Sequence, residues 1–172
     1  MAQTVHLSLY KSPKEKGPQI KGESSQLADG RENTIECVFF ESSVTTPRDA
    51  GSGKATGRRQ FAPIKIRKRI DASSPELAKA MSQNEKLDGK FDFFRPASDG
   101  VGGDQAFYSI EFARGFISDI TVCMPDTMEN PGLTNAEAYE TVTFTFDEIT
   151  WTYNGSGKPT VHTDSWSGSE RK

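Results

Sequence analysis

The sequence has few of the residues on which metal, redox and catalytic sites usually depend. Its 172 residues include two cysteines and two histidines. Cys37 and Cys123 lie far apart within apolar, strand-like runs, without the close spacing or histidine neighbours of a zinc or redox site. We therefore expect two buried thiols, and we expect no metal or other cofactor.

Long apolar runs are also lacking. No window approaches the length of a membrane span, and residues 1–16 contain no continuous apolar segment of the kind found in a signal peptide. We expect no membrane insertion and no export by a conventional signal peptide. The hydrophobic fraction is 34% and the mean hydropathy is −0.63, which predicts one domain over residues 1–172 with a modest core and long loops.

A phosphate-binding loop is suggested by residues 51–57, which contain a Gly-Lys pair among further glycines. A Walker A motif needs another glycine five positions before that pair and Ser or Thr directly after it. Arg48 and Ala55 occupy those positions, and an apparent strand follows where a helix should begin. We expect a flexible or docking loop in place of a nucleotide site.

Hydrolytic and acid/base sites are equally poorly supported. His162, Asp164 and Ser165 lie on one extended stretch, where neighbouring side chains point to alternate sides and cannot form a relay among themselves. The adjacent carboxylates of Asp147 and Glu148 would face opposite ways on a strand. The sequence therefore predicts a protein that is not an enzyme.

Period-two alternation of apolar residues is the main structural signal, and it predicts a β-rich fold. The expected strands cover residues 5–10, 35–39, 64–70, 91–93, 108–112, 141–146 and 149–153, with residues 116–122 as an extension or a new strand. Apolar residues are even-numbered before Asp147 and odd-numbered after Glu148. This change of parity predicts a bulge or sharp bend of the kind that turns the corner of a barrel.

One short helix is expected over residues 74–84. Ser74 can cap it and Pro75 suits its first position. Because so short a helix is marginal alone, it should dock on the sheet. Its apolar stripe consists of Leu77, Ala80 and Met81.

The remaining segments are expected to be loops. They cover residues 12–33, 43–57, 97–104 and 125–136, and a C-terminal tail over residues 155–172. The loop over residues 43–57 is longer than most hairpin connections, and long ordered loops tend to be functional. Its candidate contact residues, with the start of the next strand, are Thr46, Pro47, Arg48, Asp49, Gly51, Gly53, Lys54, Arg58 and Arg59.

Charge is unevenly distributed, although the net charge is only −3. Residues 54–69 contain seven Lys or Arg and no acidic residue, whereas residues 115–157 contain seven acidic residues and no Lys or Arg. The basic run lacks the interleaved aromatic residues of an RNA-binding sheet, and the protein is acidic overall, so we do not expect nucleic-acid binding. The run is either a solvated strand face or a surface that pairs with the acidic region of another copy.

Aromatic residues are concentrated near the C-terminus. They could form a ligand-binding platform, but alternating aromatic residues more often fill the core or mouth of a barrel. The expected core residues here are Phe144, Phe146, Ile149, Trp151, Tyr153 and Trp166.

The order of several motifs resembles a known family. These are the turn over residues 20–24, Gly57-Arg58-Arg59 before the basic strand, the junction over residues 70–75, and residues 149–153 with Asp164-Ser165-Trp166. In this order they resemble the Hcp (hemolysin-coregulated protein) family of bacterial type VI secretion. The chain departs from the family in its basic strand, Ile64–Lys68, which in relatives is commonly aromatic and threonine-rich.

The resemblance implies a single-domain β-barrel of antiparallel strands with one flanking helix and an extended loop, assembled into hexameric rings. The rings would stack into the inner tube of a contractile injector, with the loop over residues 43–57 joining one ring to the next. Subunits would assemble in the cytoplasm and be secreted through the machine. The implied partners are other copies of the chain, the contractile sheath, the baseplate, a VgrG-like spike at the tube tip and small effector proteins in the lumen.

Two alternatives remain open at this point. One is a tube protein of a phage tail or of an extracellular contractile injector, which the sequence separates poorly from the first reading. The other is a monomeric ligand-binding barrel. A size measurement separates the monomer from the ring, because a ring elutes at several times the 18.9 kDa mass of the chain.

Overall fold

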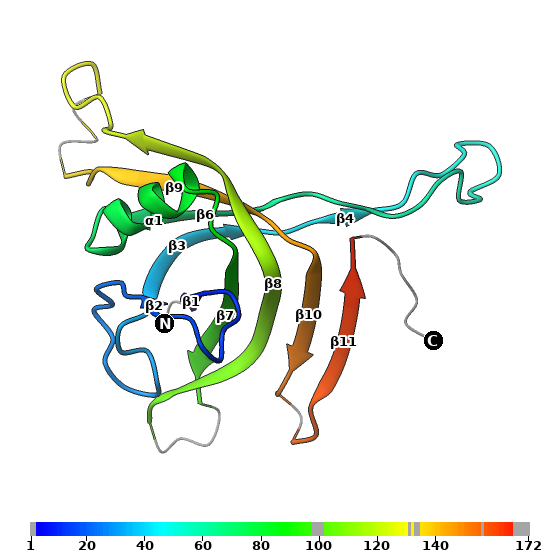
Figure 1. Ribbon diagram of the computed structural model, residues 1–172, viewed down its shortest axis with the longest axis horizontal. Helices are drawn as coiled ribbons and strands as arrows, with labels where there is room; N and C mark the ends of the chain where they lie inside the picture. The colour runs from blue at the N-terminus through cyan, green and yellow to red at the C-terminus, as the bar shows by residue number, and fades with distance from the viewer. Residues whose placement is uncertain (1–2, 98–101, 131, 133–134, 156, 167–172) are drawn as a thin grey trace.

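The computed structural model describes residues 3–97, 102–130, 132, 135–155 and 157–166 (Figure 1). In chain order, these form β1 (Thr4–Lys11), β2 (Gln19–Ile20), β3 (Ile35–Glu41), β4 (Val44–Thr45), β5 (Gln60–Phe61), β6 (Ile64–Arg69), α1 (Ser73–Ser82), β7 (Leu87–Pro96), β8 (Asp104–Cys123), β9 (Tyr139–Thr145), β10 (Glu148–Tyr153) and β11 (Thr160–Ser165).

An antiparallel barrel forms the body of the molecule. Its strands follow the order β8-β7-β1-β3-β6-β9, and pairing of β9 back to β8 closes it. Strands β10 and β11 continue the sheet from β8 outside the barrel, as Figure 1 shows. The predicted mainly β fold, with an antiparallel barrel and one short helix, is confirmed.

The long strand β8 explains the change of parity near Asp147. Its first half pairs with β10 and its second half pairs with β9, so both partners must turn where β8 turns. Arg114 lies at this turn with φ of 52°, a left-handed conformation that is uncommon for a residue with a side chain. Its Nε donates to Asp147 Oδ2 at 2.7 Å, which joins the two bends. Residues 116–122 are therefore an extension of the preceding strand.

The barrel interior is filled by apolar side chains. Phe91 and Phe144 have no exposed surface, and the Phe144 ring lies 5.3 Å from that of Phe112 and 6.5 Å from that of Phe91. Aliphatic residues from the neighbouring strands complete this core, among them Leu7, Leu9, Ile35, Ile64, Ile66, Val142 and Ile149. Each such side chain contributes about 1.5–3 kcal/mol through its burial.

Helix α1 packs against β8 and β2. Leu77 and Ala80 are buried, as an i, i+3 stripe requires, but Met81 is 40% exposed and does not dock as predicted. The helix also begins differently: Asp71, ahead of the first turn, accepts the Ser73 backbone N–H through Oδ1 at 2.9 Å, and Ser74 lies inside the helix. Pro75 is tolerated in the first turn because its missing N–H would have no helical partner there.

Three segments expected to be irregular contain short strands. Residues 12–33 include β2, residues 43–57 lie largely in a hairpin with β4 and β5, and the tail after residue 155 includes β11. These strands are short or polar, so they show no apolar alternation and depend on pairing with a neighbour. No helix in the described part of the chain has the length and apolarity needed to cross a membrane.

Candidate functional site

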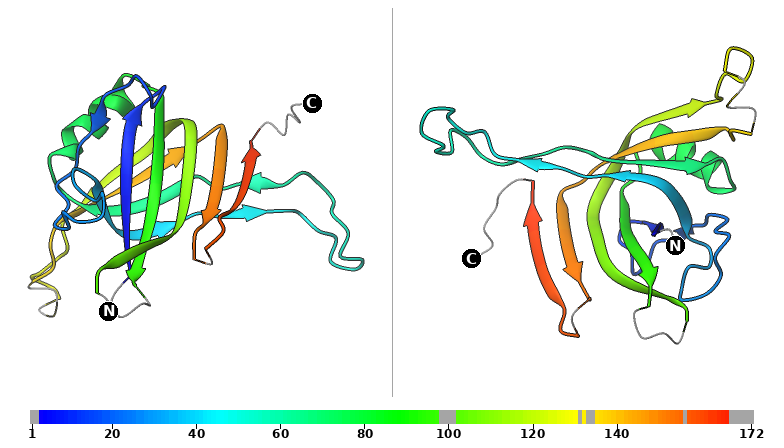
Figure 2. Two further views of the ribbon diagram at one scale, coloured as in Figure 1. Left: turned by 90° about the horizontal axis from the view of Figure 1, so that it is seen from below. Right: turned by 180° about the vertical axis from the view of Figure 1, so that it is seen from behind.

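A β-hairpin over residues 43–61, the projecting hairpin, extends well beyond the barrel (Figures 1 and 2). Strands β4 and β5 pair at its base, and Arg48 pairs with Ala55 farther out. Backbone hydrogen bonds from Ala62 to Ser43 O at 3.0 Å and from Thr56 to Pro47 O at 2.9 Å complete the ladder. The segment is therefore an ordered ribbon, where the sequence predicted a loop.

The tip of the projecting hairpin is held by a local hydrogen-bond network. Asp49 Oδ2 accepts the Ser52 backbone N–H at 2.7 Å and the Ser52 hydroxyl at 2.8 Å. These hydrogen bonds from Ser52 lower the pKa of the Asp49 carboxyl. Gly53 has φ of 67°, which glycine adopts without the steric cost of a side chain, and its carbonyl accepts Arg48 Nη1 at 3.0 Å.

The cations of the projecting hairpin differ in their surroundings. Arg59 is paired with a carboxylate of this chain. Within the described residues, no carboxylate lies within ion-pair distance of Arg48, Lys54 or Arg58. All of the predicted contact residues of this segment are exposed: Thr46, Pro47, Arg48, Asp49, Gly51, Gly53, Lys54, Arg58 and Arg59.

Arg59 connects the base of the projecting hairpin to the last strand. Its guanidinium donates to both carboxylate oxygens of Asp164 in β11, and its Nη2 donates to Ser165 O at 3.3 Å. The hydrogen bonds between the two side chains raise the pKa of Arg59 and lower that of Asp164. Such a bidentate contact fixes the orientation of the two side chains as well as the distance between them.

Aromatic rings pack beside this ion pair. The Phe61 ring lies 5.6 Å from Phe146, 5.9 Å from Trp166 and 6.4 Å from Trp151. Trp166 in turn lies 5.8 Å from Phe146. These spacings are typical of interacting aromatic pairs. The C-terminal aromatic residues therefore join the hairpin base to the β9–β10 corner.

The predicted core residues at the C-terminus consequently separate into two groups. Phe144 and Ile149 are fully buried, Phe146 is nearly so, and Trp151 is half-buried against the core. Trp166 is 47% exposed and Tyr153 is 39% exposed, so neither fills the barrel. An open, mostly apolar groove of about 340 Å³ lies beside Trp166 and is lined by Arg114, Phe116, Thr145, Phe146 and Asp147.

A buried ion cluster links β6, β9 and the start of α1, and sequence reasoning missed it. Lys68 has no exposed surface, whereas the sequence predicts that it belongs to a basic run on the protein surface. It has the same parity as Ile64 and Ile66, which indicates its inward position. Ile70 shares this parity too, but it lies beyond the end of β6 and is 50% exposed. The Lys68 ammonium donates to Glu140 Oε1 at 2.6 Å and to Ser74 Oγ at 3.0 Å.

The candidate catalytic residues are occupied in other contacts. The His162 ring stacks on Trp151 at 5.7 Å, and Asp164 binds Arg59. Asp147 and Glu148 both approach Arg114 Nη2, at 2.7 and 3.7 Å. Among the described residues, no group of three or more His, Cys, Asp or Glu is placed to hold a metal ion. Both cysteines are free, with Cys37 buried and Cys123 half-buried.

Comparison with known proteins identifies the family to which the chain belongs. The family model described as "Type VI secretion system effector, Hcp" matches residues 10–153. The "Major exported protein" of Pseudomonas aeruginosa is 32% identical over 139 residues, which cover 80% of this chain and 78% of that protein.

Solved structures agree with this match. The Hcp1 protein of Escherichia coli EAEC 042 superposes with a TM-score of 0.79 at 28% identity, covering 96% of this chain and 99% of that one. The secreted protein Hcp3 of P. aeruginosa shares the fold with a TM-score of 0.71 at 22% identity, covering 96% and 99% of the two chains.

Proposed function

The chain belongs to the Hcp family of type VI secretion proteins, and on this premise we propose that it is a subunit of the secretion tube. Six copies form a ring, and rings stack into an inner tube that a contractile sheath propels into a target cell. The tube carries small effector proteins in its lumen. The family is exported and structural, without enzymatic activity.

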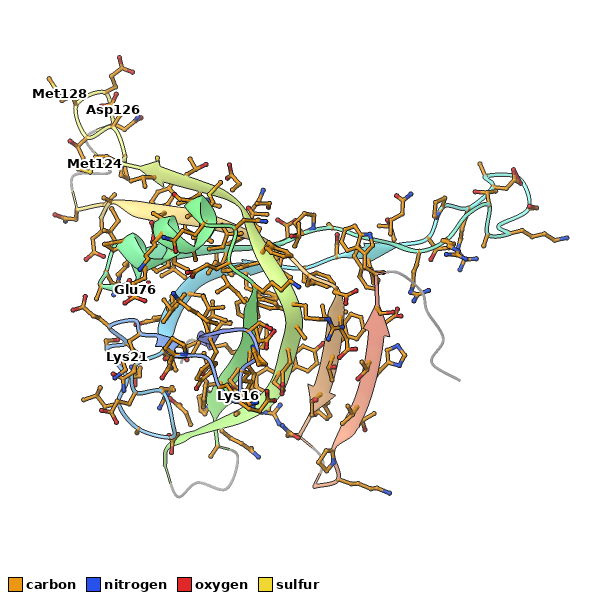
Figure 3. The ribbon with its side chains drawn as sticks, viewed as in Figure 1. Lys16, Lys21, Glu76, Met124, Asp126 and Met128 are labelled. Carbon is orange, nitrogen blue, oxygen red and sulfur yellow. The ribbon has the colours of Figure 1, made fainter. Side chains whose placement is uncertain are left out.

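The projecting hairpin is the observation that carries this proposal. An ordered ribbon that extends beyond the barrel and presents Arg48, Lys54 and Arg58 to solvent is suited to contact a neighbouring subunit. Residues 124–130, the acidic tip, contain Asp126 and Glu129 and project from the opposite end of the molecule (Figure 3). Opposite charges at opposite ends favour head-to-tail stacking, in which the hairpin of one ring meets the acidic end of the next.

The strength of such stacking follows from repetition. Contacts between exposed charges contribute about 0.2–1 kcal/mol each. A symmetric ring repeats every contact around its face, so the total is large although each contact is weak. Because exposed charges are screened by salt, stacking should weaken with ionic strength much more than ring closure does.

Further partners follow from the tube role. We infer that the rings contact the contractile sheath along their outside, a baseplate and a VgrG-like spike at the ends of the tube, and effectors within the lumen. Assembly takes place in the cytoplasm before secretion through the machine.

The alternative functions differ in how they fit the structure. A tube in a phage tail or an extracellular injector would use the same surfaces. A monomeric ligand-binding barrel is disfavoured because side chains such as Phe91 and Phe144 fill the barrel interior.

The test combines size measurement, electron microscopy and a secretion assay. Deleting residues 49–54, or reversing charge with R48E and K54E, should leave rings in solution but abolish tubes and secretion. The matched control reverses two exposed cations elsewhere, Lys16→Glu and Lys79→Glu, and should leave tubes intact. A wild-type protein that stays monomeric at every concentration would refute the tube role. Normal tubes from the deletion variant would show that the hairpin only connects two strands and does not contact the next ring.

A further inference from the structure

The projecting hairpin is not part of the main sheet. Strands β4 and β5 form a separate two-stranded sheet that continues the β3–β6 pair of the barrel beyond a short break at residues 42–43 and 62–63. A backbone hydrogen bond from Ala62 to Ser43 O at 3.0 Å crosses this break, and the hairpin can bend there relative to the barrel. Two-stranded ribbons have little stability of their own. Side-chain contacts at the base can therefore help to set the angle between hairpin and barrel.

The last strand, β11, supplies such contacts. Its pairing partner in the sheet is β10, and residues 160–163 are exposed, so the strand adds little to the barrel core. Its C-terminal end, however, lies next to the hairpin base in the views of Figures 1 and 2. There Asp164 binds Arg59, although 105 positions of sequence separate the two residues.

Trp166 completes the connection. Its ring packs on Phe61 of the hairpin and on Phe146 of the β9–β10 corner, so it touches the hairpin and the barrel at once. Its backbone N–H donates to Asp147 O at 2.8 Å, which anchors this end of the strand to the corner. The Asp164 carboxylate is itself oriented, because Oδ1 accepts the Ser165 N–H at 2.9 Å.

We propose that the C-terminal end of β11 is a brace that sets the direction of the projecting hairpin, with Asp164 and Trp166 as positioning residues for ring stacking. This inference rests on the proposed function of the hairpin. A ring stacks efficiently when all of its hairpins point the same way, since weak contacts sum only if they form together. Without the brace, each hairpin samples a range of directions, and rings close normally but stack poorly.

The direct test measures hairpin direction. Spin labels at Ser52→Cys on the hairpin tip and Lys79→Cys on α1, in a Cys123→Ser background, report the distance between hairpin and barrel. The native Cys37 does not interfere because it is buried, and its burial raises its pKa to about 12. Labelled chains are diluted into unlabelled ones so that each ring carries one pair. Asp164→Asn and Trp166→Ala should broaden the distance distribution, and the double variant should broaden it most.

The second readout is assembly. The double variant should lose about tenfold or more of its sedimentable tubes while the chain still folds and ring size stays unchanged. Conservative variants provide the rescue: Trp166→Phe keeps an aromatic ring, and the exchange of Arg59→Asp with Asp164→Arg restores the ion pair. The matched control is Lys14→Gln, which removes an exposed pair with Glu111 outside the hairpin and should change neither readout.

Three results would overturn the proposal: an unchanged distance distribution, tube loss without broadening, or broadening that leaves tube yield intact. The last result is read together with the hairpin deletion. If that deletion also leaves tubes intact, the stacking role of the hairpin has failed. If the deletion abolishes tubes, the hairpin does stack rings and the brace alone is refuted.

Discussion

Lys68 Nζ lies 2.6 Å from Glu140 Oε1 across β6 and β9, and both residues are almost wholly excluded from solvent. Asp71 Oδ1 at 2.8 Å and the Arg69 carbonyl at 2.8 Å complete the surroundings of the ammonium group, together with Ser74 Oγ. Two carboxylates thus face one buried cation. The cluster ties two barrel strands to the start of α1, so its loss should affect barrel and helix together.

The first prediction concerns this pair. Lys68→Met should lower the free energy of unfolding by about 3–5 kcal/mol, because it leaves the buried Glu140 carboxylate without its cation. Glu140→Gln should cost less, because Asp71 still pairs with the Lys68 ammonium group. The double variant should be less destabilised than the sum of the two, since it removes both charges. Denaturant unfolding measures all three.

A matched control uses the exposed pair of Arg69 and Glu137. Arg69→Gln should change stability by less than about 1 kcal/mol. If Lys68→Met were equally mild, the buried cluster would not hold the strands and helix together.

The second prediction concerns the start of α1. Asp71→Ala should cost about 1 kcal/mol or more, because Asp71 accepts the Ser73 N–H and also approaches Lys68. Ser74→Ala should also cost about 1 kcal/mol, though through the loss of its contacts with Lys68 and Glu140. Leu77→Asp should cost considerably more, since it buries a carboxylate where the helix docks. Thermal melts rank the three; an unchanged melting temperature for Leu77→Asp would mean that the helix does not dock.

The sequence reveals the strands that carry their own apolar face and misses those that do not. In β6, Ile64 and Ile66 alternate with Lys65 and Arg67, so the pattern is visible without any partner. In β11, by contrast, Val161 is the single aliphatic residue of Thr160–Ser165, and the strand exists because β10 pairs with it. Residue propensity and apolar periodicity cannot predict a strand whose formation depends on pairing with a neighbouring strand.

The candidate site likewise has features that the sequence predicts and features that depend on the fold. The length, glycines and cations of residues 43–59 indicate a contact segment, because these are properties of the local sequence. The connection of Arg59 to Asp164 depends on a fold that brings together residues 105 positions apart. The burial of Lys68 was missed for a different reason. Its parity in β6 places its side chain inside the barrel, but a charged residue is usually exposed. The carboxylate that compensates its charge, Glu140, is distant in sequence.

The third prediction concerns close packing between β7 and β8. A side chain at Gly89 would place its Cβ 2.3 Å from Phe112 Cε1 and 3.2 Å from Leu7 Cδ1, so the Phe112 ring lies against bare backbone. Gly89→Ala should therefore destabilise the protein by about 1–3 kcal/mol through overpacking. In that background, Phe112→Leu should cost less than it does in the wild type, because the clashing ring is gone. The control is Gly57→Ala, whose Cβ would meet no atom closer than 3.6 Å, and which should be nearly neutral.

The last prediction concerns the pH dependence of stability and the buried histidine. His6 is 1% exposed; its Nδ1 lies 3.1 Å from Thr34 Oγ1, and its Nε2 has no hydrogen-bond partner among the described residues. Burial lowers the pKa of His6, and the opposing effect of Glu36 does not restore it. In the unfolded chain the group titrates near pH 6.5. Between that value and the lower folded pKa, the unfolded chain binds more protons, so stability falls as the pH decreases.

Unfolding free energies measured from pH 8 to pH 5 should therefore be level above about pH 7 and then decline, with a slope of up to about 1.4 kcal/mol per pH unit. His6→Gln should be less stable at pH 8 but lack this decline, because glutamine does not titrate. His162→Gln is the matched control, since His162 is the other histidine and lies exposed on β11, so its removal should preserve the decline. A decline that persists unchanged in His6→Gln would show that His6 accepts its proton in the folded barrel as readily as in the unfolded chain.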